Sequence, residues 1–319
     1  MGEKENMNRN AKCREFLPAV LCLFGLACAG KAAPTGADMP AAEPGPEMAT
    51  AAEQSGDLRV GYCTGDVAKA KAGGFDYAEL GVKNFAAMSD EEFATFLATH
   101  KEVGLPTPVG NVFLPGEIKV VGPEPTDPAT QMAYVQTAFD RAQQLGLEII
   151  VFGSGGSRKI PDGFPEEKAF DQLVEFAKRI APEAQKRNII LAVEPLQSKE
   201  TNSINSAAEG LKWVKAVDHP NFRLMVDFYH LSLEKEDPAI LVEAAPYLTH
   251  IHIANPEGRV FPQELSEYDY SKFFQRLREI GYKGGISVEA KAENYETMAP
   301  KAISLIRTAW QEGGKANTN

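Results

Sequence analysis

Four side chains that can bind metal ions stand where apolar stretches of this sequence end. Glu194 follows "IILAV", Asp227 follows "RLMV", His252 lies in "HIHIA" and Glu289 follows "ISV". Neighbouring members are about 25 to 37 residues apart, roughly the length of one strand plus one helix. Each residue alone could cap a helix or satisfy a polar group in the core. Four of them at equivalent places predict one shared site.

The segment "MVDFYHL" (residues 225–231) shows most clearly the choice between a structural role and a shared site. It puts Asp227 at the carboxyl end of an apolar run and His230 three positions later. A buried carboxylate without a partner costs on the order of several kcal/mol. Two partners remain open for Asp227: the backbone N–H groups of a following helix, which it would cap, or a bound cation.

Three carboxylates and one imidazole suit one divalent metal ion, such as Mn²⁺, Mg²⁺, Zn²⁺ or Co²⁺, with coordination positions left for substrate oxygens. Without a cation, three neighbouring carboxylates would repel one another and their pKa values would rise. We therefore predict that Glu194, Asp227, His252 and Glu289 bind one divalent metal ion.

The elements that must position these residues are eight short apolar runs, each followed by an amphipathic stretch. The runs are nearly continuously apolar, which indicates strands buried on both faces of a parallel sheet. The predicted strands span residues 58–63, 77–82, 107–113, 147–153, 188–194, 222–227, 248–254 and 284–290. The predicted helices span residues 66–72, 89–103, 127–145, 165–187, 206–217, 237–245, 270–280 and 296–312.

Eight strand–helix units in about 255 residues match one α/β domain, the (β/α)8 TIM barrel. The competing architecture, an open doubly wound sheet, rarely needs eight regular units, and no G-x-G-x-x-G follows the first predicted strand. The carboxyl ends of barrel strands meet at one mouth, so this fold would bring the four ligands together.

The motifs on these strands resemble a known family, the xylose-isomerase-like barrels of the sugar (phosphate) isomerase/epimerase group. This group includes ketose 3-epimerases and hydroxypyruvate isomerases. The resemblance covers residues 57–313. It rests on the order and spacing of "AELGV", "FGSGGSRKIPDGF", "AVEPLQSKE", "MVDFYHL", "HIHIAN" and "SVEA".

The resemblance implies roles for individual residues. Glu194 and Glu289 would be catalytic as well as metal ligands, exchanging protons with opposite faces of a carbon next to a carbonyl through an enediolate. His230 and Glu200 would bind the substrate. Arg259 would be a third substrate-binding residue, although its spacing from His252 is one residue longer than in the epimerases.

The first half of the barrel supplies further candidates for substrate binding. Glu79 ends the second predicted strand and could contact substrate, orient a neighbouring ligand or form a structural ion pair. Asn111 at the end of the third strand is comparable. Arg158, in the glycine-rich "GSGGSRK", could hold an anion or belong to a solvated loop. His250 is expected to point away from the mouth into packing.

Composition narrows the class of partner. The chain has 319 residues, 44% of them hydrophobic, and a net charge of −11, which suits a globular protein and disfavours a nucleic-acid partner. We expect a small sugar or keto-sugar as the partner, while the oligomeric state stays open.

The first 56 residues predict export. Residues 1–28 are expected to be an export signal, because Lys12 and Arg14 precede a short apolar run. The signal would end either at a lipidated Cys28, since "GLAC" resembles a lipoprotein cleavage box, or by ordinary cleavage near "ACAGKAA". We expect residues 29–56 to be an Ala- and Pro-rich disordered linker, residues 57–313 the barrel and residues 314–319 a tail. The protein would be periplasmic or anchored to a membrane through its lipid. Cys63 would be the one remaining thiol and is expected as a small buried residue.

These observations favour a metal-dependent sugar isomerase or epimerase acting on a free or oxidised sugar. A lyase, dehydratase or hydrolase acting on a keto-sugar or keto-glycoside is the alternative, because it would begin with the same proton abstraction. A non-catalytic carbohydrate-binding lipoprotein would be expected to lack an intact ligand set. An apurinic-site endonuclease needs additional histidines where this chain has Glu79 and Asn111.

Overall fold

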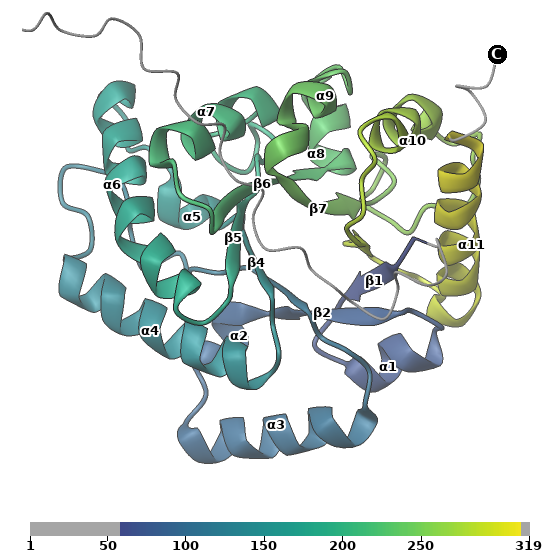
Figure 1. The fold of residues 1–319 in the computed structure, drawn as a ribbon, viewed down its shortest axis with the longest axis horizontal. Coiled ribbons are helices and arrows are strands. Elements are labelled where there is room, and N and C mark those ends of the chain that lie inside the picture. The colour runs from purple at the N-terminus through teal and green to yellow at the C-terminus, as the bar shows by residue number, and fades with distance from the viewer. Residues whose placement is uncertain (1–57, 314–319) are drawn as a thin grey trace, which may run out of the picture. The chain divides into compact units, whose positions relative to one another are not determined.

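Residues 58–313, which the computed structural model describes, form a closed barrel of eight parallel strands in chain order (Figure 1). The predicted TIM barrel is confirmed. The strands are shorter at their ends than the apolar runs, because several terminal residues lie in the connecting loops. They are β1 (Val60–Cys63), β2 (Tyr77–Gly81), β3 (Val109–Asn111), β4 (Ile149–Phe152), β5 (Ile190–Val193), β6 (Phe222–Asp227), β7 (Leu248–Ile253) and β8 (Ile286–Val288).

Helices surround the barrel and connect its strands. They are α1 (Val67–Ala72), α2 (Val82–Ala86), α3 (Asp90–Val103), α4 (Pro128–Gln144), α5 (Gly155–Arg158), α6 (Glu166–Gln185), α7 (Ala207–Val217), α8 (Phe228–Leu233), α9 (Ile240–Ala244), α10 (Tyr270–Glu279) and α11 (Tyr295–Gly313), with a short 3-10 helix, η2 (Ala245–Tyr247). Sequence periodicity did not predict α2, α5 and α8. They have only 5, 4 and 6 residues, which is too short to show a helical repeat.

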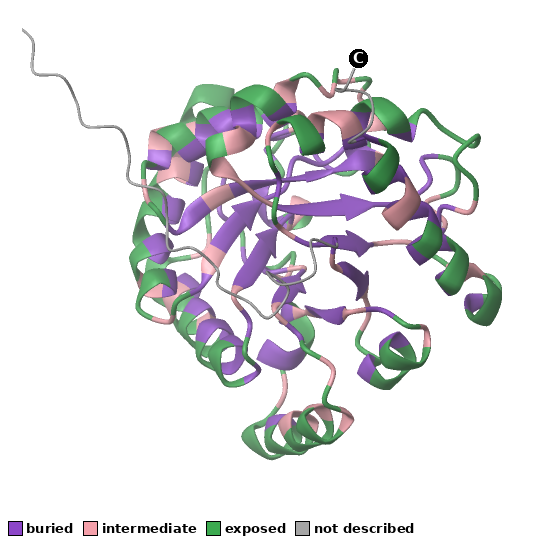
Figure 2. Cartoon of the chain, turned by 45° about the vertical axis from the view of Figure 1, so that its right-hand side comes forward, coloured by how far each residue is buried: buried purple, intermediate pink, exposed green. Residues whose placement is uncertain are grey.

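The strands are buried on both faces, as their continuous apolar sequences predict (Figure 2). On the outer face they pack under the helices in one large apolar cluster. On the inner face a second, smaller cluster fills part of the barrel and consists of Tyr77, Val109, Ile149, Val151, Ala192 and Met225. The remaining inner positions therefore include room for polar side chains.

Local signals fix where several helices begin. The "SDEE" segment starts α3, where the Ser89 side chain accepts from the backbone N–H of Glu92 and Glu92 accepts from the backbone N–H of Ser89. Ser206 and Glu209 repeat this reciprocal pattern at α7. These caps hold the loops that leave the strand ends in defined positions.

No helix among residues 58–313 combines the length and the apolar character needed to cross a membrane. The predicted export signal, the linker and the carboxyl-terminal tail lie outside the described residues.

Candidate metal centre

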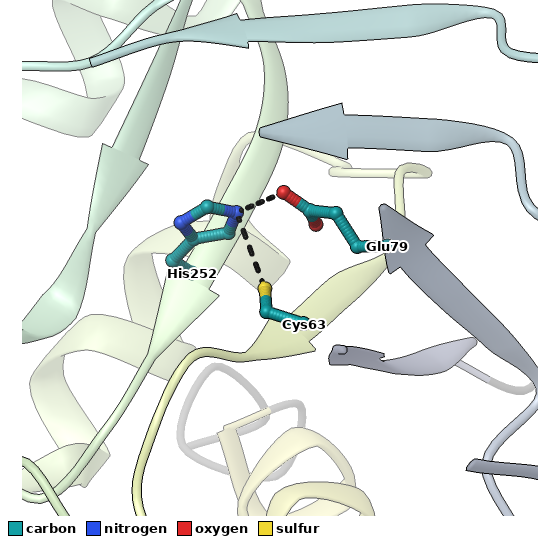
Figure 3. A group of neighbouring side chains, drawn as sticks. All are labelled: Cys63, Glu79 and His252. Atoms are coloured by element: carbon teal, nitrogen blue, oxygen red, sulfur yellow. Dashed lines mark hydrogen bonds and ion pairs between the residues drawn. The ribbon is translucent and has the colours of Figure 1, made fainter. Parts of the chain in front are cut away.

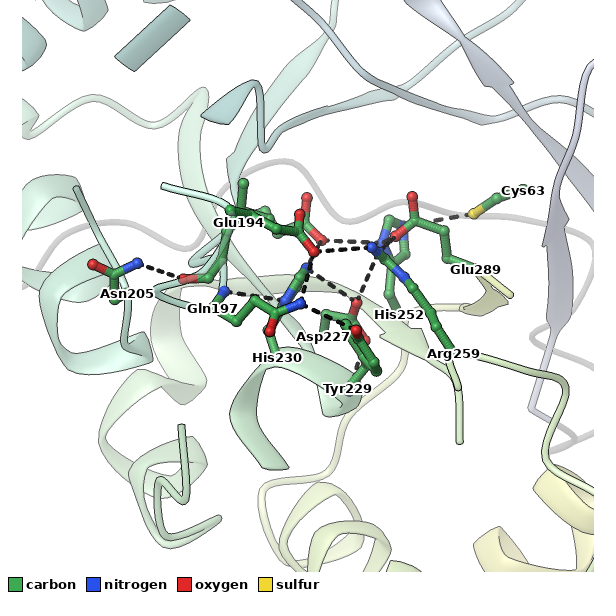
Figure 4. A network of polar contacts seen from close by, with 12 residues as sticks. Cys63, Glu194, Gln197, Asn205, Asp227, Tyr229, His230, His252, Arg259 and Glu289 are labelled. Atoms are coloured by element: carbon green, nitrogen blue, oxygen red, sulfur yellow. Dashed lines mark hydrogen bonds and ion pairs between the residues drawn. The ribbon is translucent and has the colours of Figure 1, made fainter. Parts of the chain in front are cut away.

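The four predicted ligands converge at the carboxyl ends of β5 to β8 (Figure 4). Each offers one ligand atom, and these atoms all lie within 4.8 Å of one another. Asp227 and His252 lie in the last two positions of β6 and β7, while Glu194 and Glu289 directly follow β5 and β8. The barrel thus brings together side chains from four successive strands.

Asp227 caps the following helix with one oxygen and leaves its other oxygen available to a cation. Its Oδ1 accepts a hydrogen bond of 2.9 Å from the backbone N–H of Tyr229 and so caps α8. Its Oδ2 is buried and has no hydrogen-bond partner within the described residues. One oxygen therefore starts the helix while the other faces the ligand cluster.

Three of the four candidate ligands have a buried atom without a hydrogen-bond partner, which is typical of a cation site. Among the described residues, Glu194 Oε1, Asp227 Oδ2 and His252 Nδ1 are all buried and none makes a hydrogen bond. Leaving such atoms unpaired is costly, and a divalent cation would satisfy all three together. The oxygen and nitrogen donors also match the chemistry of the predicted metals.

The electrostatics of the cluster favour the binding of a cation. Burial, together with the charges of Glu194 and Glu289, raises the pKa of Asp227 to about 7. Burial and the charge of Glu289 likewise raise the pKa of Glu194. Burial opposes the charge of Glu289 too, but His252 and Arg259 lower its pKa overall. The two proposed acid/base carboxylates therefore have pKa values shifted in opposite directions.

Glu79 orients the ligand imidazole, as Figure 3 shows. Its Oε1 lies 2.8 Å from His252 Nε2. Burial opposes the charge of Glu79, but His252 and His250 lower its pKa far below the ordinary value. Because an ionised carboxylate only accepts hydrogen bonds, His252 Nε2 must carry a hydrogen, and Nδ1 faces Glu194 and Glu289 at 3.4 and 3.2 Å. Glu79 thus leaves Nδ1 as the ring nitrogen that could bind a metal ion.

Two expectations about this region need correction. Glu79 has no exposed surface and both its oxygens are bound to imidazoles, so it acts through His252 rather than by contacting substrate. His250 does not point away from the site. Strand side chains repeat every two residues, so His250 and His252 share the inner face, and His250 Nε2 lies 3.0 Å from Glu79 Oε2.

Cys63, the last residue of β1, also approaches this histidine, with its Sγ 3.9 Å from His252 Nε2 (Figure 3). Burial and the charge of Glu79 raise the pKa of Cys63 well above its ordinary value. The thiol is therefore protonated at neutral pH and is a poor nucleophile.

His230 presents a hydrogen-bond donor to the ligand cluster. Its Nδ1 accepts from the backbone N–H of Gln197 at 3.1 Å, which leaves the hydrogen of the neutral ring on Nε2. Burial and the charge of Arg259 lower the pKa of His230 to about 3, so the ring is neutral at physiological pH. Nε2 lies 3.7 Å from Asp227 Oδ2 and makes no hydrogen bond within the described residues.

Arg259 reaches the cluster from the loop after β7. Its Nη2 lies 2.6 Å from Glu289 Oε2 and 3.6 Å from Asp227 Oδ2, and its Nη1 lies 3.3 Å from Glu200 Oε1. Gly258 and Arg259 both have positive φ values, +79° and +52°, so this residue is presented by a tight left-handed turn. The structure brings Arg259 and Glu200 together beside the metal ligands.

Two residues at this rim were missed by the sequence analysis. The Gln197 side-chain amide donates to Glu200 Oε1 at 2.8 Å and to the Tyr229 hydroxyl at 3.1 Å. The Arg259 guanidinium packs over the Tyr229 ring, 4.7 Å from the ring centre, in a cation–π contact. Gln197 lies in the motif "AVEPLQSKE" and Tyr229 in "MVDFYHL". Their place in these motifs is the one sequence feature that could have indicated a role at the rim.

Arg158 is the third correction, because it is fully buried and cannot meet an anionic substrate. Its Nη2 donates to the backbone oxygen of Glu194 at 2.6 Å. The glycine-rich turn that carries it is the short helix α5 rather than a solvated loop. Arg158 therefore braces the end of β5 from behind the site.

Asn111 ends β3 and is largely buried. Within residues 58–313 the structure gives its side chain no hydrogen bond to any of the four ligands, so its predicted contact with substrate stays a prediction.

Comparison with known proteins agrees with this geometry. The family model described as "Xylose isomerase-like TIM barrel" matches residues 67–309. D-psicose 3-epimerase of Agrobacterium fabrum is 27% identical over 228 residues, which cover 68% of this chain and 75% of the relative. L-ribulose 3-epimerase of Methylomonas sp. is 24% identical over 265 residues, or 81% and 89% of the two chains.

Solved structures share the fold. D-allulose 3-epimerase from Methylomonas sp. in complex with D-allulose superposes with a TM-score of 0.70 at 20% identity, covering 79% of this chain and 97% of that one. The family model spans most of the described barrel and all four predicted ligands. This chain is therefore a member of the xylose isomerase-like TIM barrel family.

Proposed function

We propose that this protein is a divalent-metal-dependent epimerase or isomerase of ketoses, with Glu194 and Glu289 as the proton-transfer pair. The observation that carries the proposal is the convergence of Glu194, Asp227, His252 and Glu289, whose ligand atoms lie within 4.8 Å of one another. The similarity to ketose 3-epimerases supports the same reaction class.

The two glutamates divide the work between base and acid. Glu289, with its lowered pKa, would take a proton from the carbon next to the substrate carbonyl, and the electron pair would pass into an enediolate. Glu194, with its raised pKa, would return a proton to the opposite face of that carbon. A bound divalent cation would polarise the substrate carbonyl and so make the carbon-bound hydrogen acidic enough for a carboxylate base.

The remaining polar groups would orient the substrate. His230 offers its Nε2 hydrogen toward the space above Asp227, which suits a hydroxyl or carbonyl oxygen of a sugar. Arg259 and Glu200, paired at 3.3 Å, form the rim and can donate to and accept from further hydroxyl groups. Such fixed donors and acceptors hold the reacting carbon between the two glutamates.

An uncharged sugar fits this rim better than a sugar phosphate. Of the two arginines predicted for substrate binding, Arg158 is buried and bonded to the chain. Arg259 is surrounded by the carboxylates of Glu289, Asp227 and Glu200. Arg158 is therefore out of reach of a phosphate group because it is fully buried, and Arg259 already has carboxylate partners.

The test is solvent exchange in D2O. Purified protein loaded with Mn²⁺ is incubated with free ketoses and with their phosphates, and the carbon-bound hydrogens are followed by NMR. Because Mn²⁺ is paramagnetic, the samples for NMR contain Mg²⁺ in its place. We expect deuterium at the carbon next to the carbonyl together with the epimeric or isomeric sugar. An eliminated product would instead assign a lyase, and sugar binding without exchange would identify a carbohydrate-binding protein.

A further inference from the structure

We propose that His250 is a positioning residue of the metal centre, acting through Glu79 on His252, and that Ser287 and Tyr77 hold His250 in place. The proposal rests on the metal centre of the proposed function, but it does not depend on which reaction takes place there. The structure carries it as a continuous chain of buried polar groups that begins at His252 and runs into the barrel.

Each step of this chain is a short contact. His252 Nε2 and His250 Nε2 lie 2.8 and 3.0 Å from the two oxygens of Glu79. Ser287 Oγ lies 3.2 Å from His250 Nε2 and 2.9 Å from the Tyr77 hydroxyl. All five side chains are at most 2% exposed.

The second oxygen of Glu79 explains why His250 matters for the metal. An ionised carboxylate only accepts, so both imidazoles must donate from Nε2. If His250 were absent, Glu79 Oε2 would be buried without its imidazole donor, and the carboxylate would have to rotate to find another. That rotation would weaken its hold on His252 and release the ring orientation that would present Nδ1 to a metal ion.

This series of buried polar side chains connects strands that are not neighbours in the barrel. Glu79 and Tyr77 come from β2, the two histidines from β7 and Ser287 from β8. In the closed barrel β2 and β7 are not neighbours, so the Glu79–histidine contacts cross the interior. The centres of the two imidazole rings lie 5.1 Å apart on the inner face of β7, and the ring planes are at 89° to each other.

Two glycines make room for the far end of the chain. A Cβ atom at Gly61 would lie 2.1 Å from the Tyr77 ring, and one at Gly285 would lie 2.6 Å from the Tyr77 hydroxyl. Any other residue at either position would displace the tyrosine. The barrel interior is therefore shaped around this polar chain rather than filled with aliphatic side chains there.

The experiment compares Mn²⁺ affinity and stability in metal-free protein by isothermal titration calorimetry and thermal unfolding. We expect His250→Leu to raise the Mn²⁺ Kd by roughly 10- to 100-fold. His250→Gln, whose amide can donate to Glu79 Oε2, should restore the Kd to within about threefold of the wild-type value. Ser287→Ala and Tyr77→Phe should weaken binding by smaller factors.

Ile251→Val is the matched control, because Ile251 is fully buried on the opposite face of the same strand and should change stability without changing the Kd. A folded His250→Leu protein with the wild-type Kd would overturn the proposal. If His250→Leu does not fold, an unchanged Kd in both Ser287→Ala and Tyr77→Phe overturns it. Wild-type protein that binds none of Mn²⁺, Mg²⁺, Zn²⁺ and Co²⁺ would instead refute the metal centre itself.

Discussion

Asp227 shows how one residue can serve folding and chemistry together. Its Oδ1 caps α8 and its Oδ2 faces the ligand cluster. The cap fixes the carboxylate plane, so the second oxygen is held facing the other candidate ligands. His230, the residue directly after Tyr229, is then carried by the first turn of α8 to the edge of the site.

We predict that Mn²⁺ affinity falls as the pH drops below about 7. The pKa of Asp227 is raised to about 7 in the metal-free protein, so below that pH the carboxyl holds a proton and cannot ligate. Burial opposes the charged form of His252, but Glu79 raises its pKa overall, so its ring must also release a proton on binding. Each released proton changes the Kd by up to about tenfold per pH unit.

Calorimetric titrations in buffers of different ionisation enthalpy measure both the Kd and the protons released. A Kd that is constant between about pH 5.5 and pH 8 would contradict this prediction.

The raised pKa of Asp227 also affects the stability of the metal-free protein. The unfolded chain ionises Asp227 near 3.8, whereas the folded protein keeps the proton until about 7, so stability falls as pH rises through that window.

We predict that Glu289→Gln retains the fold but loses proton exchange with the solvent. The amide keeps the size of the side chain and one oxygen, yet it cannot accept a proton from carbon. Loss of a general base costs roughly 10² to 10⁴-fold in rate. Deuterium incorporation measured by NMR gives the rate, and Glu257→Gln, an exposed change in the loop between β7 and α10, is the control. Unchanged exchange would remove Glu289 from its assigned role.

At the scale of elements, the loops after β4 and β5 support each other. The Asn202 side chain accepts from the backbone N–H of Ile160 at 2.8 Å and donates to its backbone oxygen at 2.9 Å. The Ser203 hydroxyl donates to the backbone oxygen of Arg158 at 2.8 Å, and Arg158 in turn donates to Glu194. The ligand Glu194 is thus held by a pair of interlocked loops.

We predict that Gly153→Ala weakens Mn²⁺ binding by roughly tenfold with only a small loss of stability. A Cβ at Gly153 would lie 2.3 Å from Glu194 Oε2, so the carboxylate would have to move. The end of a side chain moves easily, and for that reason the fold survives while the ligand position does not. Gly156→Ala is the matched control, since its Cβ would meet only Gly116 Cα at 3.4 Å. Equal Kd values for both variants would contradict the prediction.

The sequence predicted the strands and the ligand set because both depend on local patterns. Continuous apolar runs mark buried parallel strands, and the ligand positions follow from where those runs end. The roles of Glu79, His250 and Arg158 depend instead on contacts across the barrel. His250 meets Glu79 across 171 positions of sequence and Arg158 meets Glu194 across 36. No local pattern reports such distant pairs.

For the whole molecule, the candidate metal centre connects half of the barrel wall. Its predicted ligands come from β5, β6, β7 and β8, and Glu79 links them to β2 on the other side. The four ligand residues bring three carboxylates into one buried cluster, in a chain whose net charge is already −11. A cation bound there would offset their mutual repulsion and join four strands at once.

We therefore predict that removing divalent metal lowers the thermal stability of the whole barrel. At a free Mn²⁺ concentration 100 times the Kd, binding adds about 2.7 kcal/mol to the free energy of unfolding. For a barrel of this size that corresponds to a rise in Tm of roughly 5 to 11 °C, which chelation should reverse. Differential scanning calorimetry with and without Mn²⁺ measures the shift, and Asp227→Ala, which lacks a ligand, should show little of it. An equal shift in that variant would mean that the stabilising ion binds elsewhere.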